Sequence, residues 1–431
     1  MRLINLTTFE LEEYYGNVPQ YAILSHRWGK EELGFQDWTK YSQSTDRKTW
    51  KGRGIAKILG ARKQAIQDGY HYLWCDTCCI DKSSSAELSE NINSMFNYYA
   101  DAAVCYAYMR DVPELGEGGA SEQMKKFEAS RWFTRGWTLQ ELLAPKKVVF
   151  FAKDWSLIGT RGKLVTRISN ITGIATRFIL RRTQDPAVPP PLFAAGVATK
   201  MSWLSRRETT RVEDMAYCML GIFDINMPLL YGEGHKAFTR LQEEIIRVSN
   251  DQSIFCWRWD EKFVPHNWVS ILSPSPRAFD QSADYKAYRL IEDGDEYKTL
   301  MSQLTYSLTN IGLSINLPVV PCSPPEIRTA MIWARCRYIP TCSEELWAFT
   351  MSRMGFYTSS TLAWPMVRQP LPHHLNHIFY AKLPTQFTHR TSMRCTRTIA
   401  SCIRDETNVG KVIFHLGAGA PVCSFQLDED E

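Results

Sequence analysis

The first 155 residues alternate short apolar runs with segments of helical periodicity, which restricts the folds open to this part of the chain. Four runs are bounded like buried strands, at residues 21–25, 70–75, 103–109 and 148–152. Between them, apolar residues recur at helical spacing over about 55–66 and 88–99, and Gly69 is placed to end the first helix. Such alternation predicts an α/β fold, a mostly parallel sheet with helices on both faces, whose ligands bind beyond the carboxyl ends of the strands.

The rest of the chain divides where its composition changes. An excess of Lys and Arg begins at residue 156 and continues to 212, and is either a surface that docks on the acidic remainder or an anion-binding face. From residue 253 onward the apolar residues come in short runs bounded by turn residues. We expect four parts, namely an α/β domain at 1–155, a basic connector with a Pro-rich linker at 156–192, a helical segment at 193–252 and a β-rich module of unknown role at 253–431.

Composition excludes several classes of protein. Of the 431 residues, 44% are hydrophobic and 22% are charged, which is the balance of a folded globular chain. The formal net charge of +4 is too small to indicate nucleic-acid binding, and no apolar run reaches the length of a membrane span. The N-terminus lacks a secretory signal, and the 12 Cys lie mostly in apolar runs, as buried thiols do. We expect a cytoplasmic protein with no membrane span and no nucleic-acid partner.

Two patterns have the ligands of a metal site without its spacing. Cys75 and Cys78 form a CxxC with no second pair, and a buried strand end explains them more simply. His373, His374 and His377 lack the glutamate of an HExxH helix. Since no GxxxxGK[ST] sequence is present either, we expect neither a metal nor a P-loop nucleotide site.

Four strings in the first domain are more specific than an α/β pattern requires. They are Leu24-Ser25-His26-Arg27-Trp28-Gly29; Leu73-Trp74-Cys75-Asp76 with Cys79-Ile80-Asp81; Met95 with Tyr98, Tyr99 and Ala100; and Arg135-Gly136-Trp137-Thr138-Leu139-Gln140-Glu141-Leu142. In this order they resemble the fungal HET domain, named for heterokaryon incompatibility, from about residue 4 to 142. Segments 209–217, 227–234 and 237–244 look like the region that commonly follows HET domains. Lys82 stands where many relatives carry Gln, so position 82 is given no role.

The resemblance implies both a fold and a chemistry. HET domains are similar to TIR domains, which have a flavodoxin-like parallel sheet and some of which cleave NAD at the nicotinamide–ribose bond. The TIR string Ser-x-Trp-Cys-x-x-Glu-Leu is similar to this chain around residues 130–142, which maps the catalytic carboxylate onto Glu141. A carboxylate there would stabilise the positive charge that develops on the ribose. The residues expected to contact NAD are Ser25, His26, Trp28, Asp76, Trp132 and Trp137.

Each of these residues also has a structural interpretation that the sequence leaves open. Glu141 lies among leucines on an amphipathic helix, where a surface or capping Glu is common. The Trp side chains suit core packing, and Asp76 suits a helix cap. His26 titrates near neutral pH in water but equally suits a structural hydrogen bond to the following loop.

Two functions therefore stay open. The resemblance implies an effector of heterokaryon incompatibility and fungal non-self recognition that self-associates and triggers programmed cell death. One hypothesis makes the domain an NAD glycohydrolase whose toxicity follows from NAD depletion, and the alternative is a non-enzymatic signalling or protein-interaction module. In both cases we expect no cofactor, because NAD would be a substrate. The expected partners are further copies of the chain and an incompatibility or sensor protein.

Overall fold

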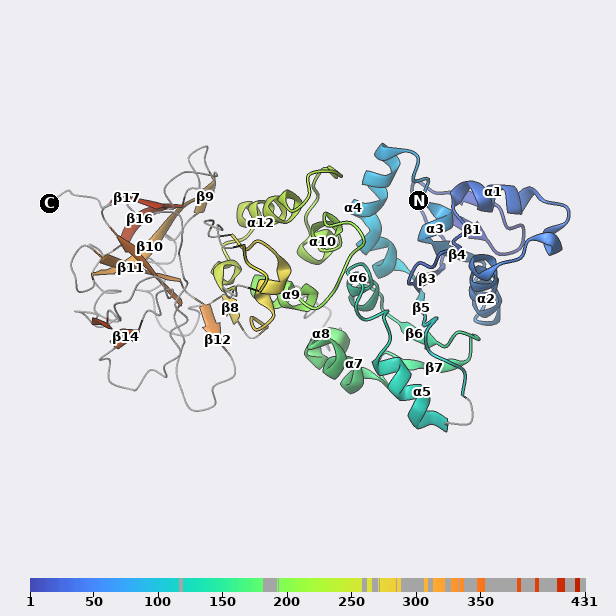
Figure 1. The fold of residues 1–431 in the computed structure, drawn as a ribbon. Helices are drawn as coiled ribbons and strands as arrows, with labels where there is room; N and C mark the ends of the chain where they lie inside the picture. Colours follow the sequence, from blue (N-terminus) through green and yellow to red (C-terminus); the bar gives the residue numbers. More distant parts are fainter. Residues whose placement is uncertain are drawn as a thin grey trace. The chain divides into compact units, whose positions relative to one another are not determined.

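The computed structural model describes residues 1–115, 119–180, 192, 194–257, 262–265, 270 and 272–283, together with short strands between residues 285 and 426. The chain forms two compact units (Figure 1). The first consists of Met1–Ala194 and Arg206–Ala237, and the second of Ala195–Ser205 and Phe238–Glu431. The chain thus leaves the first unit after residue 194 and returns to it before finally leaving. Apart from Leu192, the Pro-rich stretch predicted as a linker lies outside the described residues.

A seven-stranded sheet organises the first unit. Its strands are β1 (Arg2–Asn5), β2 (Leu11–Glu13), β3 (Ala22–His26), β4 (Tyr72–Cys75), β5 (Val104–Tyr108), β6 (Val148–Phe151) and β7 (Leu157–Thr160). They lie in the order β2-β1-β4-β3-β5-β6-β7. The four central strands, β4, β3, β5 and β6, are parallel to one another, and β1, β2 and β7 are added antiparallel at the two edges.

The central strands are the four that the sequence predicts, and their arrangement confirms a sheet that is parallel at its centre. Every residue of β3 and β6 is buried, as expected of short apolar runs in a sheet covered on both faces. The edge strands were not predicted. β2 has no buried residue and β7 has one, so neither shows a continuous apolar run or an alternation that a pattern search detects.

Helices connect the strands of the first unit. They are α1 (Phe35–Gln43), α2 (Arg53–Gln67), α3 (Asp76–Cys79), α4 (Ser85–Asp101), α5 (Gly119–Glu128), α6 (Thr138–Leu143), α7 (Val165–Thr172) and α8 (Thr176–Leu180), with a short 3-10 turn at Arg47–Thr49. The two predicted helices are α2 and α4. Gly69 takes a φ of +83° just beyond α2, a conformation that favours glycine at a helix end. Ser84 caps α4 by accepting a hydrogen bond from the Glu87 amide at 3.3 Å.

The winding of the chain creates a switch point beside β3. From β3 the chain crosses by α2 to β4 on one side, and from β4 it crosses by α4 to β5 on the other side of β3. Because such crossovers are right-handed, the connecting helices lie on opposite faces, with α2 on one face and α4 and α6 on the other (Figure 1). The carboxyl ends of β3 and β5, where the strand order reverses, are where a sheet of this kind binds ligands.

The returning segment Arg206–Ala237 is tied to the first unit by main-chain and side-chain hydrogen bonds. It contains α10 (Asp214–Tyr217) and α11 (Leu220–Phe223). The Gly136 amide donates to the Glu208 carbonyl at 2.9 Å, next to the start of α6. The Asn93 side chain of α4 donates to the Met227 carbonyl at 3.3 Å and accepts from the Met227 amide at 3.1 Å.

The second unit begins with helices. They are α9 (Val197–Leu204), α12 (Lys236–Val248, which begins in the first unit) and the 3-10 turns Gln252–Phe255 and Pro276–Phe279. Its strands are β8 (Tyr285–Ala287), β9 (Tyr306–Leu308), β10 (Leu313–Pro321), β11 (Ile327–Ile332), β12 (Ala334–Cys336), β13 (Trp347–Ser352), β14 (Ile378–Tyr380), β15 (Ser392–Arg394), β16 (Val409–Phe414) and β17 (Cys423–Gln426). Since much of residues 253–431 lies outside the described ranges, a β-rich module there stays a prediction. No helix in the described part of the chain is long and apolar enough to cross a membrane.

Candidate functional site

A buried carboxyl group lies at the switch point of the sheet. The Ser25 hydroxyl, in β3, donates a hydrogen bond to Oε2 of Glu141 in α6. The same hydroxyl oxygen accepts a hydrogen bond from the Trp132 indole Nε1 at 2.9 Å. All three side chains are buried, and Ser25 has no exposed surface. The structure thus brings together three of the residues that the sequence predicts for the site.

Local structure explains why these side chains meet. Ser25 is the penultimate residue of β3, next to the carboxyl end of that strand. Trp132 lies in the turns between α5 and α6, where the Thr138 hydroxyl donates to the Trp132 carbonyl at 2.6 Å and holds the turn against the helix. α6 is only six residues long and all of them are buried, so Glu141 points into the unit rather than to solvent.

Burial changes the acidity of Glu141. It raises the pKa of this carboxyl to about 8, because the ionised form loses its hydration. The hydrogen bond from Ser25 opposes the rise, and the negative charge of Asp76 adds to it. Glu141 therefore keeps its proton at neutral pH and loses it in mildly alkaline solution, which is unusual for a carboxyl and typical of functional sites.

Four arginines gather around this end of the sheet. Arg27 follows β3, Arg110 follows β5, and Arg131 and Arg135 precede α6. Burial and the positive charges of Arg131, Arg135 and Arg110 lower the pKa of Arg27. None of the four guanidinium groups forms an ion pair with a residue that the structure describes. The negative charge of Asp111 acts on Arg27 in the opposite sense, but four arginines exceed this one carboxylate. An excess of positive charge at the ligand-binding edge of a sheet suits an anionic ligand.

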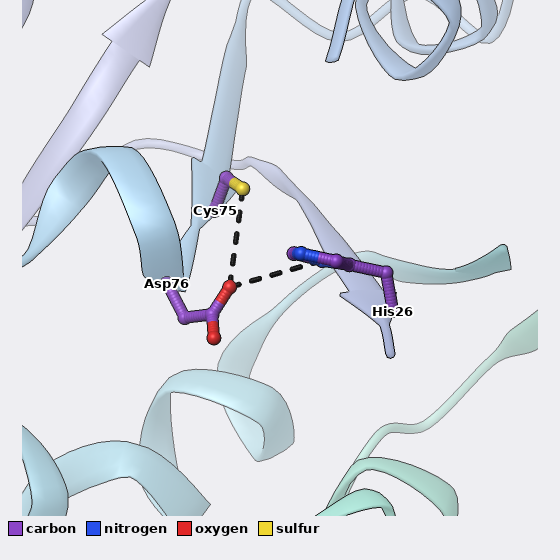
Figure 2. Close-up of side chains that lie close together, drawn as sticks. All are labelled: His26, Cys75 and Asp76. Carbon is purple, nitrogen blue, oxygen red and sulfur yellow. Dashed lines mark hydrogen bonds and ion pairs between the residues drawn. The ribbon is translucent and has the colours of Figure 1, made fainter. Parts of the chain in front are cut away.

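A second polar cluster follows β3 and β4 (Figure 2). His26 ends β3, and its side chain is 1% exposed. Its Nδ1 lies 3.8 Å from Oδ1 of Asp76, the first residue of α3, and its Nε2 lies 3.4 Å from Oε2 of Glu32. Neither ring nitrogen has a hydrogen-bonding partner. Figure 2 shows the Asp76 carboxylate facing both His26 and Cys75, whose Sγ lies 4.0 Å from the same Oδ1.

Trp28 is the exposed member of the predicted set. Its side chain, in a residue that is 48% exposed, donates from Nε1 to Oδ2 of Asp76 at 2.7 Å. Lys82, which the sequence left without a role, places its ammonium group 3.6 Å from the centre of the Trp28 ring. Trp28 therefore holds Asp76 through its edge and Lys82 on its face.

Trp137 does not join either cluster. It precedes α6, and its side chain forms a hydrogen bond with Asp214 of the returning segment. Burial raises the pKa of Asp214, and this hydrogen bond opposes the rise. Trp137 therefore helps to attach the returning segment to the rest of the first unit.

The described cysteines are buried and unbridged. Cys75, Cys78, Cys79, Cys105, Cys218 and Cys256 are all free thiols, as their apolar surroundings predict. A hydrogen bond from Cys78 lowers the pKa of Cys75, whereas burial raises the pKa of Cys78.

Sequence reasoning missed the arginine cluster, Glu32 and the grouping of Cys75 with His26. Its basic stretch begins at residue 156, whereas the gathered arginines precede that residue and lie far apart along the chain. Their common signal is position, since Arg27 and Arg110 each stand shortly after a predicted parallel strand. As a metal ligand, Cys75 was considered only with Cys78, although it directly precedes Asp76 at a strand end.

Comparison with known proteins adds three findings. Residues 21–119 match the family described as "Heterokaryon incompatibility protein (HET)", and residues 236–267 match a "Domain of unknown function (DUF8212)". Over 233 residues, or 53% of its length, the chain is 45% identical to the "Vegetative incompatibility protein HET-E-1" of Podospora anserina. That alignment spans 16% of the relative's own length. No solved structure matches the chain.

The family match covers part of the candidate site. Ser25, His26, Trp28 and Asp76 lie within residues 21–119, whereas Glu141 lies beyond them and reaches the matched segment by its contact with Ser25. The match, the 45% identity to a HET protein and the four strings in their order agree on one family. Residues 21–119 therefore carry the sequence signature of a heterokaryon incompatibility (HET) domain.

Proposed function

We propose that this protein acts in heterokaryon incompatibility and that its HET domain cleaves NAD. The proposed role in incompatibility is supported by the HET domain and by the 45% identity to a vegetative incompatibility protein. NAD cleavage is supported by one observation above the others, the buried Glu141 carboxyl that Ser25 and Trp132 hold at the switch point. The parallel strands have the order 2-1-3-4 in the chain direction, as flavodoxin-like sheets do.

The proposed reaction breaks the bond between ribose C1′ and the nicotinamide nitrogen. The bonding electrons leave with nicotinamide, water attacks C1′ and gives up a proton, and the products are ADP-ribose and nicotinamide. As the bond breaks, positive charge moves onto the ribose. The ionised Glu141 carboxylate would stabilise that charge, and its buried position strengthens the interaction because little water screens it.

The surroundings of Glu141 suit the rest of a dinucleotide. Arg27, Arg110, Arg131 and Arg135 would bind the diphosphate, since guanidinium groups pair with phosphate oxygens in bidentate fashion. Trp28 is 48% exposed and has Lys82 over one face of its ring, so stacking on a base would use the opposite face. Ser25 and Trp132 would orient the Glu141 carboxyl rather than contact the substrate, because both are fully occupied and buried.

The pKa of Glu141 gives the reaction a pH dependence. If the carboxylate is the active form, the rate rises with pH until Glu141 is ionised, near its pKa of about 8. A substrate whose nicotinamide ring is positively charged lowers that pKa when it binds beside the carboxyl. The plateau of kcat would then begin at a lower pH than the plateau of kcat/KM.

The test is release of nicotinamide from NAD by concentrated full-length protein, followed by chromatography. Glu141→Gln should abolish release while the far-UV circular dichroism spectrum stays unchanged. Glu122→Gln, on the exposed side of α5, is the matched control and should retain full activity. Because we also propose that self-association completes the site, the measurement is repeated with the protein clustered through an added dimerising tag. No release under either condition refutes NAD cleavage.

The alternative is a non-enzymatic interaction module, which the burial of Glu141 favours, because a fully buried carboxyl also serves as a structural hydrogen-bonding group. Expression in fungal cells separates the two. Cell death that requires Glu141 and follows a fall in NAD supports the enzyme. Cell death at constant NAD would instead assign the incompatibility role to contacts with a further copy or a sensor protein.

A further inference from the structure

We propose that His26, Cys75 and Asp76 bind a transition-metal ion, with Zn²⁺ as the best fit. One ligand atom from each residue lies within 4.8 Å of the other two. The set combines an imidazole nitrogen, a thiolate sulfur and a carboxylate oxygen, which are the three ligand types that zinc accepts in proteins. The proposed ligand atoms are not those of the proposed NAD chemistry, which assigns the reacting carboxylate to Glu141.

The distances between ligand atoms are close to those of a bound ion. Tetrahedral zinc with bonds of about 2.0–2.3 Å separates its ligand atoms by about 3.4–3.6 Å. Here Asp76 Oδ1 lies 3.8 Å from His26 Nδ1 and 4.0 Å from Cys75 Sγ. The third pair, a His26 ring nitrogen and Cys75 Sγ, lies within 4.8 Å, so binding an ion also requires these two side chains to approach each other. Cys75 and Asp76 adjoin in the chain and His26 lies on the neighbouring strand, so we expect side-chain rotation to supply this approach.

His26 supplies the independent observation. Its side chain is 1% exposed, and among the described residues its nitrogens have only long carboxylate contacts, Nε2 at 3.4 Å from Glu32 and Nδ1 at 3.8 Å from Asp76, neither with the geometry of a hydrogen bond. A buried polar group that is poorly paired costs roughly 1–3 kcal/mol, which coordination of an ion by Nδ1 would offset. Nδ1 lies 3.8 Å from Asp76 Oδ1, and Figure 2 shows His26 and Cys75 on either side of that carboxylate.

The groups behind the three ligands are those that usually support a metal site. The other ring nitrogen of His26, Nε2, lies 3.4 Å from the Glu32 carboxylate, which is itself paired with Lys57. A carboxylate behind a metal-bound histidine fixes the orientation of its ring. The Trp28 indole holds Oδ2 of Asp76 at 2.7 Å, which leaves Oδ1 directed toward the other two ligands. Three protein ligands leave one position for water or a ligand atom.

The probe for this site is Co²⁺, whose thiolate complexes absorb in the near-ultraviolet and the visible. Full-length protein stripped with a chelator is titrated with Co²⁺ and then with Zn²⁺. We expect a cobalt–thiolate band that saturates at one ion per chain and disappears as Zn²⁺ displaces Co²⁺. Added Zn²⁺ should also raise the thermal unfolding temperature. Absence of the band in the wild-type protein overturns the proposal, whether or not any variant folds.

Variants assign the band to its ligands. Cys75→Ala and His26→Asn should lose it, while Cys218→Ala, which removes another buried free thiol of the same unit, should retain it. Glu32→Gln should weaken binding by about 10–100-fold, the usual effect of removing a carboxylate behind a metal-bound histidine. A band that persists at full strength in Cys75→Ala places the metal on other cysteines and overturns the assignment.

Discussion

Replacing Glu141 by Gln tests the burial of this carboxyl through the pH dependence of stability. In the folded protein the pKa of Glu141 rises from 4.5 to about 8 because the side chain is desolvated. Between these values the unfolded chain has released a proton that the folded chain still binds. The contribution of the protonated carboxyl to stability is therefore complete below the lower value and is lost as the pH rises through the upper one. Within that window the free energy of unfolding falls by about 1.4 kcal/mol per pH unit.

The expected magnitude follows from the same two pKa values. Between about pH 5.5 and about pH 8.5, the linkage relation gives a loss of about 3 kcal/mol from this group in the wild-type protein. Glu141→Gln cannot ionise and keeps the oxygen that accepts from Ser25, so the variant lacks this loss. The difference in stability between the variant and wild type should therefore widen by about 3 kcal/mol in favour of the variant between about pH 5.5 and about pH 8.5.

The assay is urea unfolding of both full-length proteins, followed by tryptophan fluorescence across that pH range. The difference between the two proteins cancels the titration of the groups that they share. Glu122→Gln serves again as the exposed control and should show no such divergence. If the stability difference between Glu141→Gln and wild type stays constant across the range, Glu141 has an ordinary pKa and the inference of a desolvated acid fails.

Three further substitutions test other contacts. Ser25→Ala removes the hydrogen bond that lowers the pKa of Glu141, so the inflection in the plot of stability against pH should move above pH 8. An inflection that stays at the same pH would show that this hydrogen bond does not act on Glu141. Ser84→Ala removes the cap of α4 and should cost about 1 kcal/mol in urea unfolding at neutral pH. Gly221→Ala places a methyl group 2.0 Å from Phe96 Cβ, so it should cost about 1–3 kcal/mol or more, and an unchanged unfolding midpoint would contradict that close packing.

The sequence predicts the centre of the sheet better than its edges for a physical reason. Parallel strands buried on both faces need continuous apolar runs, so β3, β4, β5 and β6 are visible in the sequence. Edge strands such as β2 and β7 are half-exposed and mix apolar with polar residues, so they lack such a signal. Their pairing is decided by neighbouring strands rather than by their own composition.

The candidate site divides in the same way. Sequence strings single out Ser25 and Glu141 separately, but their hydrogen bond joins residues 116 positions apart and follows only from the assembled sheet. Burial decides the acidity of Glu141, and an amphipathic pattern alone leaves open whether the carboxyl faces solvent or core. The arginine cluster has no local pattern, because its members come from the ends of different elements. Charge counted along a continuous stretch pointed instead to residues 156–212.

The path of the chain has a consequence for where this domain can be cut. The family match ends at residue 119, yet α6 with Glu141 follows it, and the main chain at Gly136 is bonded to Glu208. A truncated protein that stops at residue 194 would expose the surface of α4 that Asn93 uses to hold Met227. The smallest fragment that retains every one of these bonds must extend past Met227. It therefore includes residues 195–205, which belong to the second unit. The first compact unit is thus longer than the segment that matches the HET family, and we expect fragments cut within residues 195–205 to lose the fold of that unit.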